Sequence, residues 1–387
     1  MARSPLFGRR IHIAGSISTD PAVATPDDVN AAHALVVGLV GELMRRGATF
    51  VVPVDAEPLR SDGLPICFDW LVWQTIRDTL STRPAGAPDP LAVAVQHHKT
   101  EDQIPERLHA LWDELRDSPQ VRMESAARWN IASKRMEAQA RHGDILITLG
   151  GTEGVLYLAD LYHSVGKPVI PLNLPITSDG DGSRRLYAFG EASANSRKLF
   201  HMADSGNSHD WINRIRLPSR QSVPDRVTAV VALLESLERP RAFAVRLLDP
   251  DNPEYSAVQA FFDTVVQPVI ENELGYCLTV IDGRQAYEHA RIDDEIFAKL
   301  HRASVVVADI TGSRPNCFLE LGYALGRGIR TIVTARSGSD TPFDIKTFAG
   351  LHWKTDGSAE DRRKAFRAHW EAVRNRPPLV SVGELIS

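Results

Sequence analysis

The sequence predicts an α/β protein made of two doubly wound, parallel-sheet domains in tandem. Short apolar runs rich in β-branched residues alternate with stretches whose apolar residues repeat at the helical period, an order typical of parallel sheets with crossover helices. The chain of 387 residues is too long for one average domain and suits two. Glycine-containing turns follow a buried run and precede a helix in both halves. We place the junction at Glu238-Arg239-Pro240, giving domains 1–238 and 239–387.

Composition limits the class of function. A net charge of −5 argues against a general nucleic-acid-binding surface, whereas a small phosphorylated ligand needs only a local basic pocket. Cys67, Cys277 and Cys317 form no CxxC pair, so we expect three buried reduced thiols, with no disulfide and no metal site. No apolar run reaches the length of a membrane span and the N-terminus lacks an apolar signal core. We therefore expect a cytoplasmic protein that binds neither nucleic acid polymers nor membranes.

The first half contains most of the expected elements in a simple alternating order. Apolar runs predict strands over 10–13, 49–54, 144–149 and 168–172. Helical periodicity predicts helices over 29–46, 67–80, 130–141, 154–162 and 225–237. Segment 93–109 is mixed and polar, and segment 177–190 is rich in Gly, Asp and Ser, which indicates a loop.

Two turns of this half have the chemistry of anion sites. Gly15 and Ser16 lie between a strand and a helix whose free N–H groups can hold an anion, although a tight turn without a ligand fits equally well. The buried run 144–149 leads into Gly150-Gly151-Thr152-Glu153 at a helix start, which is the architecture of a phosphate cradle. A tight turn without a ligand is the alternative here too.

The second of these segments resembles the SLOG superfamily, which includes the cytokinin-activating LOG enzymes and nucleotide-sensing domains. The resemblance rests on Arg135 upstream of the strand, Asp144 at its beginning, and the Gly-Gly-Thr turn at its end. LOG enzymes have a longer P-G-G-x-G-T-x-x-E motif, whose final Glu has no counterpart here because Glu153 lies in the turn. The resemblance therefore implies nucleotide binding, rather than LOG-type phosphoribohydrolase activity, by Arg135, Gly150, Gly151, Thr152 and Glu153, and the first turn adds Gly15 and Ser16 as candidates.

The second half is organised around the stretch 305–328. A buried strand over 305–308 ends at Asp309, and a loop leads to a helix from Asn316 to Gly326 or Gly328. Ligands of open parallel sheets bind beyond the carboxyl ends of the strands, so Asp309 and the loop are expected beside a ligand. Glu320 lies one helical turn after Asn316, in position to touch a sugar or phosphate ester. The alternative is that Glu320 only favours the helix start through the dipole.

Other strands of this half are expected over 242–248, 276–281 and 330–334, and other helices over 255–273, 292–300 and 360–374. The helix that carries Glu320 is expected to face the sheet through Phe318, Leu321, Gly322 and Leu325.

The pattern A-D-I-T-G-x-x-P-N-C-F-x-E-L-G-Y-A resembles the nucleoside 2-deoxyribosyltransferase-like family, which is related to TIR-like NAD-consuming domains. The likeness covers roughly the last third of the chain, from the strand 243–248 to a late Phe-Asp segment at 341–345. It implies a flavodoxin-like sheet in which Glu320 is the nucleophile and Asp309 and Asn316 hold the nucleoside sugar. Leu319 stands where many relatives have Tyr, so the sugar-facing wall differs there.

The first functional hypothesis is an N-glycosidase or deoxyribosyltransferase without a cofactor. Glu320 would attack the anomeric carbon of a nucleoside, nucleotide or NAD, and water or another base would resolve the glycosyl ester. Residues near the predicted strand and loop ends are the candidates for substrate binding: Arg246, Thr311, Gly312 and Asp344.

The second hypothesis is a non-catalytic nucleotide sensor. The pairing of a SLOG-like with a transferase-like domain resembles bacterial antiviral signalling assemblies, in which one domain senses a nucleotide and the other responds. On this hypothesis Glu320 only positions a ligand. A small nucleotide is the expected partner in either case, and a homo-oligomer is implied by this resemblance alone. A structural adaptor is a weaker third hypothesis because it leaves two polar crevices without a use.

Overall fold

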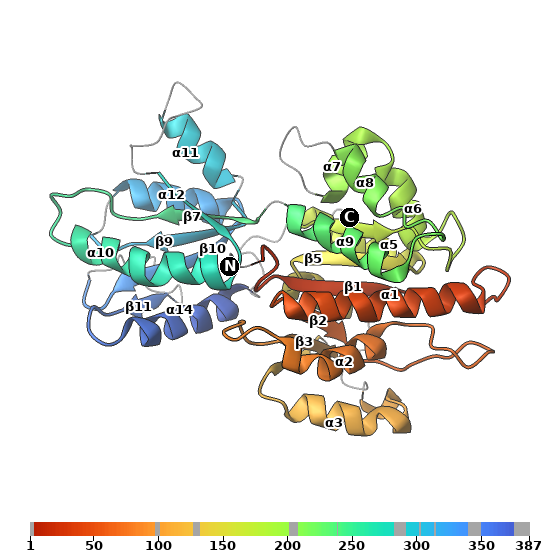
Figure 1. Ribbon diagram of the computed structural model, residues 1–387. Coiled ribbons are helices and arrows are strands. Elements are labelled where there is room, and N and C mark those ends of the chain that lie inside the picture. The colour runs from red at the N-terminus through yellow and green to blue at the C-terminus, as the bar shows by residue number, and fades with distance from the viewer. Residues whose placement is uncertain are drawn as a thin grey trace. The chain divides into compact units, whose positions relative to one another are not determined.

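The computed structural model describes residues 4–96, 101–126, 132–200, 208–237, 239–281, 292–301, 303–312, 315–339 and 350–374. The chain divides into two compact units, residues 1–238 (domain 1) and 239–387 (domain 2) (Figure 1). Each unit contains one sheet whose described strands are all parallel, with helices against it. The predicted class, two doubly wound α/β domains in tandem, is confirmed.

The sheet of domain 1 has the strand order β4-β3-β2-β1-β5-β6. The order reverses beside β1, because β2 to β4 add on one side of it and β5 and β6 on the other. Two strands, β3 and β4, were missed in the sequence, and β4 is a polar, partly exposed edge strand. The strands are β1 (Arg10–Ser16), β2 (Thr49–Pro53), β3 (Ala92–Gln96), β4 (Val121–Ser125), β5 (Ile145–Gly150) and β6 (Val169–Leu172).

The predicted helices of domain 1 are present as α1, α2, α4, α5 and α9, whereas α3, α6, α7 and α8 were not predicted. The segment expected to be a loop contains α6, which forms because its second residue is tied to the sheet. Ser183 is fully buried, and its hydroxyl lies 2.9 Å from the carbonyl oxygen of Thr148 and 3.0 Å from that of Leu172. The helices are α1 (Pro26–Arg45), α2 (Asp69–Asp78), α3 (His109–Asp117), α4 (Ala132–His142), α5 (Glu153–Ser164), α6 (Gly182–Gly190), α7 (Ser193–Phe200), α8 (Ser208–Arg214) and α9 (Val223–Ser236).

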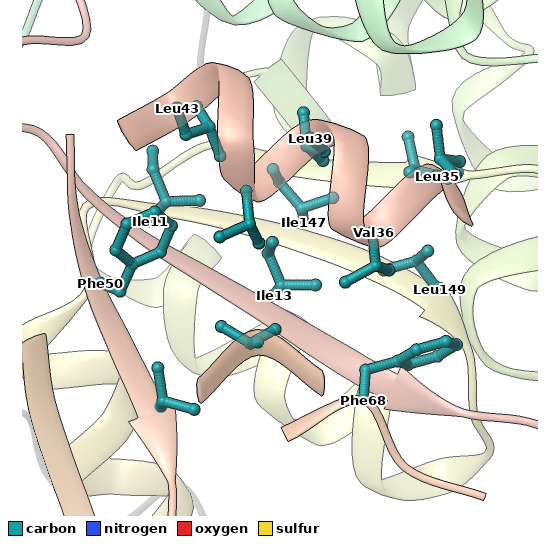
Figure 2. Close-up of a cluster of buried hydrophobic side chains, with 14 of the residues drawn as sticks. Ile11, Ile13, Leu35, Val36, Leu39, Leu43, Phe50, Phe68, Ile147 and Leu149 are labelled. Atoms are coloured by element: carbon teal, nitrogen blue, oxygen red, sulfur yellow. The ribbon is translucent and has the colours of Figure 1, made fainter. Parts of the chain in front are cut away.

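The alternation of side chains along β1 divides the core of domain 1 between the two faces of its sheet. Ile11 and Ile13 pack under α1, where Leu39 is among the contacting side chains (Figure 2). His12 points to the opposite face, and its Nδ1 lies 3.2 Å from the hydroxyl of Tyr162 in α5. Full burial of each aliphatic side chain contributes about 1.5–3 kcal/mol, so this core holds the strand ends in fixed positions.

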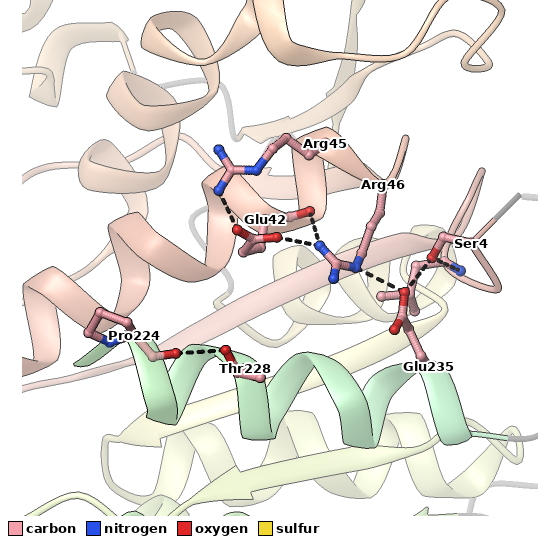
Figure 3. Close-up of polar contacts among 8 residues, drawn as sticks. Ser4, Glu42, Arg45, Arg46, Pro224, Thr228 and Glu235 are labelled. Carbon is pink, nitrogen blue, oxygen red and sulfur yellow. Dashed lines mark hydrogen bonds and ion pairs between the residues drawn. The ribbon is translucent and has the colours of Figure 1, made fainter. Parts of the chain in front are cut away.

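The two ends of domain 1 are joined by a polar cluster at the end of α1 (Figure 3). Arg46 Nε donates to Oε1 of Glu235 in α9 at 2.9 Å, and the Ser4 hydroxyl donates to the same oxygen at 2.8 Å. The Arg46 guanidinium also pairs with Glu42. The first residues of the domain, α1 and α9 are therefore fastened together at one place.

The sheet of domain 2 has the order β11-β10-β9-β7-β8, which is the flavodoxin-like arrangement. Its order reverses between β7 and β9, so the switch point lies beside the strand that carries Asp309. The short edge strand β11 was not anticipated. The strands are β7 (Arg241–Val245), β8 (Cys277–Val280), β9 (Val305–Asp309), β10 (Arg330–Arg336) and β11 (Leu351–Trp353).

Helices cover the two faces of this sheet in pairs (Figure 1). Val305 and Val307 belong to the cluster with α10 and α14, whereas Val306 and Ala308 belong to the cluster with α11 and α12. The helix predicted over 255–273 starts as α10 and continues as two π-helical stretches, the second beginning at Pro268, which lacks an N–H group. The helices are α10 (Tyr255–Phe261), α11 (Ile292–His301), α12 (Pro315–Gly326) and α14 (Ala359–Arg374).

Two expectations drawn from composition can be compared with the structure. Cys67 is partly buried and Cys317 is buried, but Cys277 is exposed at the start of β8, so the expectation of three buried thiols was wrong for it. In the part of the chain that the structure describes, no helix is both long and apolar enough to cross a membrane.

Candidate functional sites

The switch point of domain 2 gathers four of the predicted site residues. Arg246 follows β7, and Asp309, Thr311 and Gly312 lie at or just after the end of β9. A Cβ atom added to Gly312 would lie 3.3 Å from the Leu247 side chain, which places the loops after β7 and β9 side by side. A crevice at the switch point is where doubly wound sheets bind ligands.

The carboxylate of Asp309 is fully enclosed by its own domain. Its side chain has no exposed surface, and Oδ2 accepts hydrogen bonds from Thr334 Oγ1 and Trp353 Nε1, both at 2.7 Å. The backbone N–H of Thr311 donates to Oδ1 at 3.1 Å. Burial raises the pKa of Asp309, and the three donors oppose that shift. The carboxyl therefore fastens the ends of β9, β10 and β11 to one another.

Glu320 occupies one flank of α12. The helix faces the sheet through Cys317, Leu321 and Ala324, while Gly322, expected on that face, is exposed. Glu320 is partly buried, and desolvation raises its pKa to about 7. Within the described residues no hydrogen bond or ion pair involves its carboxylate. It is therefore a desolvated acid available to a ligand.

Asp309 and Glu320 lie toward different faces of the sheet. Trp353, which bonds Asp309, stacks on Phe261 of α10 with ring centroids 4.4 Å apart, so the Asp309 side chain points toward α10 and α14. Glu320 belongs to α12 on the other face. Asn316 is exposed in the first turn of the same helix. Asn316 and Glu320 therefore lie on the same helix on one face of the sheet, and the Asp309 side chain lies on the opposite face.

The remaining predicted residues of domain 2 have polar partners or lie outside the described residues. Arg246 is 9% exposed; its Nη1 donates to Gln259 Oε1 at 2.7 Å and its guanidinium lies 5.2 Å from the centre of the Phe262 ring. Thr311 is buried, and its Oγ1 accepts the backbone N–H of Arg336 at 2.9 Å. Asp344 and the surrounding segment 341–345 lie outside the described residues.

The switch point of domain 1 brings the two predicted glycine turns into contact. The parallel register pairs Ser16 of β1 with Gly150 of β5, and the N–H of Gly151 donates to the carbonyl oxygen of Ser16 at 2.7 Å. A Cβ atom added to Gly15 would lie 1.8 Å from the carbonyl oxygen of Leu149. Only glycine permits this close approach of the two strand ends.

The start of α6 closes the turn from the other side. A Cβ atom on Gly182 would lie 2.2 Å from the carbonyl oxygen of Gly151. Thr152 precedes the first residue of α5, and Glu153 is exposed with a carboxylate oxygen 3.5 Å from Arg185. Thr177 nearby is 4% exposed, and its hydroxyl has no hydrogen-bond partner within the described residues. The turn therefore has a free helix N-terminus and an unpaired hydroxyl beside it.

Sequence reasoning missed the polar side chains on the β2 side of this switch point. Asp55 lies two residues after β2, and Arg135 of α4 forms an ion pair with it. Cys67 forms an isolated bridge with Ser16, which brings the start of α2, with Asp69, next to β1. Asp55 could have been predicted from the sequence V-D-A-E, which directly follows the apolar run T-F-V-V-P. Polar residues just after a parallel strand lie at the edge of the sheet where ligands bind.

The two acids of this cluster, Asp55 and Asp69, lie in different electrostatic environments. Burial raises the pKa of Asp69 to about 7; the charges of Asp55 and Glu57 add to that shift, and Arg135 opposes it. Burial and the same acids raise the pKa of the Cys67 thiol to about 12, so the thiol stays protonated at neutral pH. Asp55 is paired with Arg135, whereas Asp69 has no hydrogen bond or ion pair within the described residues.

Metal binding finds no support in the residues that the structure describes. Among them, no three His, Cys, Asp or Glu side chains are grouped so as to hold a metal ion.

Comparisons with known proteins give one family and several distantly similar solved structures. Residues 6–234 match the family model described as "ATP nucleosidase Cap17-like, N-terminal". No curated protein sequence matches the chain significantly. A conserved protein from Enterococcus faecalis V583 is similar at 12% identity with a TM-score of 0.24, over 34% of this chain and 98% of its own. The structure titled TM1055 is similar at 17% identity with a TM-score of 0.27, over 46% and 81% respectively.

Proposed function

The chain belongs to the Cap17-like ATP nucleosidase family, and from this membership we propose that it is an N-glycosidase that cleaves the base–sugar bond of ATP or a related nucleotide. The family match supports a small nucleotide as substrate. The likeness of the last third of the chain to deoxyribosyltransferases supports the same bond as the one that breaks, and extends the candidates to nucleosides and NAD.

The attacking group in this proposal is Glu320. The C1′–N bond breaks with its electron pair leaving on the base, and a carboxylate oxygen of Glu320 forms an ester with C1′. Water then hydrolyses the ester and restores the carboxylate. The observation that carries this role is a desolvated carboxylate, without a partner in the described residues, on the helix that follows the switch-point strand.

The neighbouring residues take supporting roles. Asn316 lies one turn before Glu320 on the same helix and orients it or a sugar hydroxyl. Arg246, Thr311 and Gly312 border the crevice at the strand ends. Asp309 acts as a positioning residue, because both its oxygens already accept hydrogen bonds that join β9 to β10 and β11.

The second candidate function is a nucleotide sensor in domain 1. The contact between the turns at Ser16 and Gly151, beside the N-terminus of α5, favours phosphate binding there. In this version domain 1 recognises a nucleotide and domain 2 responds, as in the antiviral assemblies that the domain pairing resembles. The phosphate-binding set is that predicted from the sequence: Gly15, Ser16, Arg135, Gly150, Gly151, Thr152 and Glu153.

Incubation of the full chain with ATP, NAD and deoxynucleosides, with free base followed by chromatography, tests the proposal. Glu320→Gln should lower the rate of base release by several orders of magnitude, as removal of a nucleophile does in other enzymes. Glu360→Gln is the matched control, since Glu360 is an exposed acid of α14. Saturable binding with no base release from any of these substrates would support the sensor instead, and full release by Glu320→Gln would exclude Glu320 as the nucleophile.

A further inference from the structure

The loop that follows β1 is fastened to two neighbouring segments of domain 1. The N–H of Ile17 donates to the carbonyl oxygen of Ile66, in the segment after β2, at 2.9 Å. The N–H of Ser18 donates to the carbonyl oxygen of Ile176, in the segment after β6, at 2.8 Å. The last residue of β1, Ser16, therefore leads into a loop whose path is set by other segments at the carboxyl edge of the sheet.

The side chain of Arg60 joins the same loop to the segment after β2. Its Nη1 donates to the carbonyl oxygen of Ser18 at 2.6 Å, and its Nη2 donates to that of Ala24 at 2.9 Å. Asp62 binds the same guanidinium, with Oδ2 at 3.1 Å from both Nε and Nη2. The Arg60 side chain has no exposed surface. One buried cation thus holds both ends of the loop 18–24.

The backbone around Arg60 is itself fixed by a tight turn. The N–H of Arg60 donates to the carbonyl oxygen of Leu64 at 2.9 Å, and the carbonyl oxygen of Arg60 accepts the N–H of Gly63 at 3.0 Å. Leu59 and Pro65 form an antiparallel bridge on either side of this turn. The guanidinium therefore extends from a rigid anchor.

A buried guanidinium contributes little to stability by itself. Burial removes it from water, and replacement of a buried ion pair by apolar side chains of similar size is often neutral or stabilising. The guanidinium adds direction, because its planar fork reaches two oxygen atoms at fixed angles. The contacts of Arg60 therefore indicate that the loop after β1 is required in one defined position.

Ser16 is the residue that benefits from this fixed position. Its carbonyl oxygen accepts the N–H of Gly151 at 2.7 Å. Its side chain is half-buried, and the hydroxyl makes no hydrogen bond within the described residues. Ser16 ends β1, beside which the strand order reverses, and doubly wound sheets bind ligands at this reversal. A hydroxyl group of fixed position thus lies beside the glycine turn of β5.

We propose that Arg60 is a positioning residue of the nucleotide site in domain 1, where it fixes the loop after β1 so that the Ser16 hydroxyl donates to a phosphate oxygen. The inference rests on the proposed function, because it takes a nucleotide as the ligand of this switch point. Arg60 is enclosed by the protein and acts through Ser16 without touching the ligand. Both residues lie within the segment 6–234 that matches the family.

Calorimetric titration of the full chain with a C-nucleoside analogue of ATP tests the inference, because the C–C bond between its base and sugar is not hydrolysed. Arg60→Lys keeps the charge but loses the planar fork, so Kd should rise about tenfold, as loss of one ligand hydrogen bond predicts. Lys167→Met is the matched control. Lys167 is 9% exposed and donates to the carbonyl oxygens of Ala140 and Arg141, but it precedes β6 at the opposite edge of the sheet. This variant should lose stability and keep the wild-type Kd.

A double-mutant cycle with Ser16→Ala separates positioning from a purely structural role. Ser16→Ala alone should raise Kd about tenfold, and adding Arg60→Lys should raise it by less than about twofold more. The decrease in Tm caused by Arg60→Lys should be the same with and without Ser16→Ala. Asp62→Asn weakens the same contacts at a partly exposed residue, and it serves as a second variant whose effect on Kd should also disappear in Ser16→Ala.

A wild-type Kd for Arg60→Lys, or an equal increase in Kd with and without the Ser16 hydroxyl, would overturn the inference. Base release from ATP, followed for the same variants, tests the proposed function separately. Coupled effects on Kd without base release by the wild type would reject the glycosidase and keep the inference. Base release with uncoupled effects on Kd would do the reverse, and a wild type that binds neither ATP nor the analogue would reject both.

Discussion

The indole N–H of Trp353 donates a 2.7 Å hydrogen bond to Oδ2 of Asp309 across the width of two strands. Thr334, on the strand between them, donates to the same oxygen at 2.7 Å. The aspartate that the sequence motif assigns to the sugar is thus the residue that aligns the ends of three strands. The alignment of these strand ends in domain 2 depends on this carboxyl.

Trp353→Phe should lower the free energy of unfolding of domain 2 by about 1–3 kcal/mol more than Trp370→Phe. Both residues are buried in the same cluster, but the Trp370 N–H has no hydrogen-bond partner within the described residues. Both variants lose the same ring volume, and the Trp353 variant in addition loses the bond to Asp309. Urea unfolding with hydrogen exchange in β9–β11 measures the difference, and equal losses would show that the bond contributes nothing.

The rate of Glu320-dependent base release should rise with pH. Burial raises the pKa of Glu320 to about 7, and the nucleophile must be ionised. For the wild-type chain, kcat/KM should increase up to tenfold per unit below pH 7 and level off above it. A profile that falls through pH 7 would mean that Glu320 acts as an acid and not as a nucleophile.

Asp69→Asn should stabilise the protein at alkaline pH. Burial raises the pKa of Asp69 to about 7 in the folded chain, so the folded state binds a proton more tightly than the unfolded state. Wild-type stability therefore falls as pH rises from about 4 to 7 and stays lower above that. The variant should show a higher Tm than wild type at pH 8, and the difference should shrink at pH 4.5.

Asp78→Asn serves as the control for this measurement, since Asp78 is exposed on the same helix and its variant should follow wild type at both pH values. A Tm difference for Asp69→Asn that does not change with pH would indicate that the carboxyl is solvated in the folded protein.

Gly182→Ala should disrupt domain 1 far more than Gly86→Ala. Both glycines have positive φ, of +43° and +77°, so both substitutions strain the backbone by about 1–2 kcal/mol. Only at Gly182 would the new methyl group meet a backbone oxygen, that of Gly151 at 2.2 Å. We expect a further loss of about 2 kcal/mol or more, together with weaker ATP binding.

Thermal unfolding and calorimetric ATP titration of these two variants provide the measurement. If Gly182→Ala binds ATP as tightly as Gly86→Ala, the packing of α6 on the glycine turn has no part in nucleotide binding.

Local patterns were sufficient for most elements that bury a continuous apolar face, although the buried strand β3 was missed. The runs at 49–53 and 305–309 and the glycine turn at 150–151 were predicted correctly, because burial of both faces demands uninterrupted β-branched residues and a tight turn demands glycine. The edge strands β4 and β11 were missed because an edge strand needs fewer apolar residues. Helix α6 was missed because its anchor, Ser183, is polar and finds its partners in distant strands.

The sequence by itself determined the fold class of this protein, the glycine turns and the position of Glu320 on a helix after a switch-point strand. Only the tertiary structure decided that Asp309 bonds to Trp353, and that Asp55 and Asp69 gather with Arg135. The physical reason is the separation of the interacting residues along the sequence. Helix and strand patterns depend on neighbours a few residues apart, whereas Asp55 and Arg135 are 80 residues apart. The contact between Asp55 and Arg135 depends on how α4 packs against the sheet that contains β2, and no local sequence pattern predicts that packing.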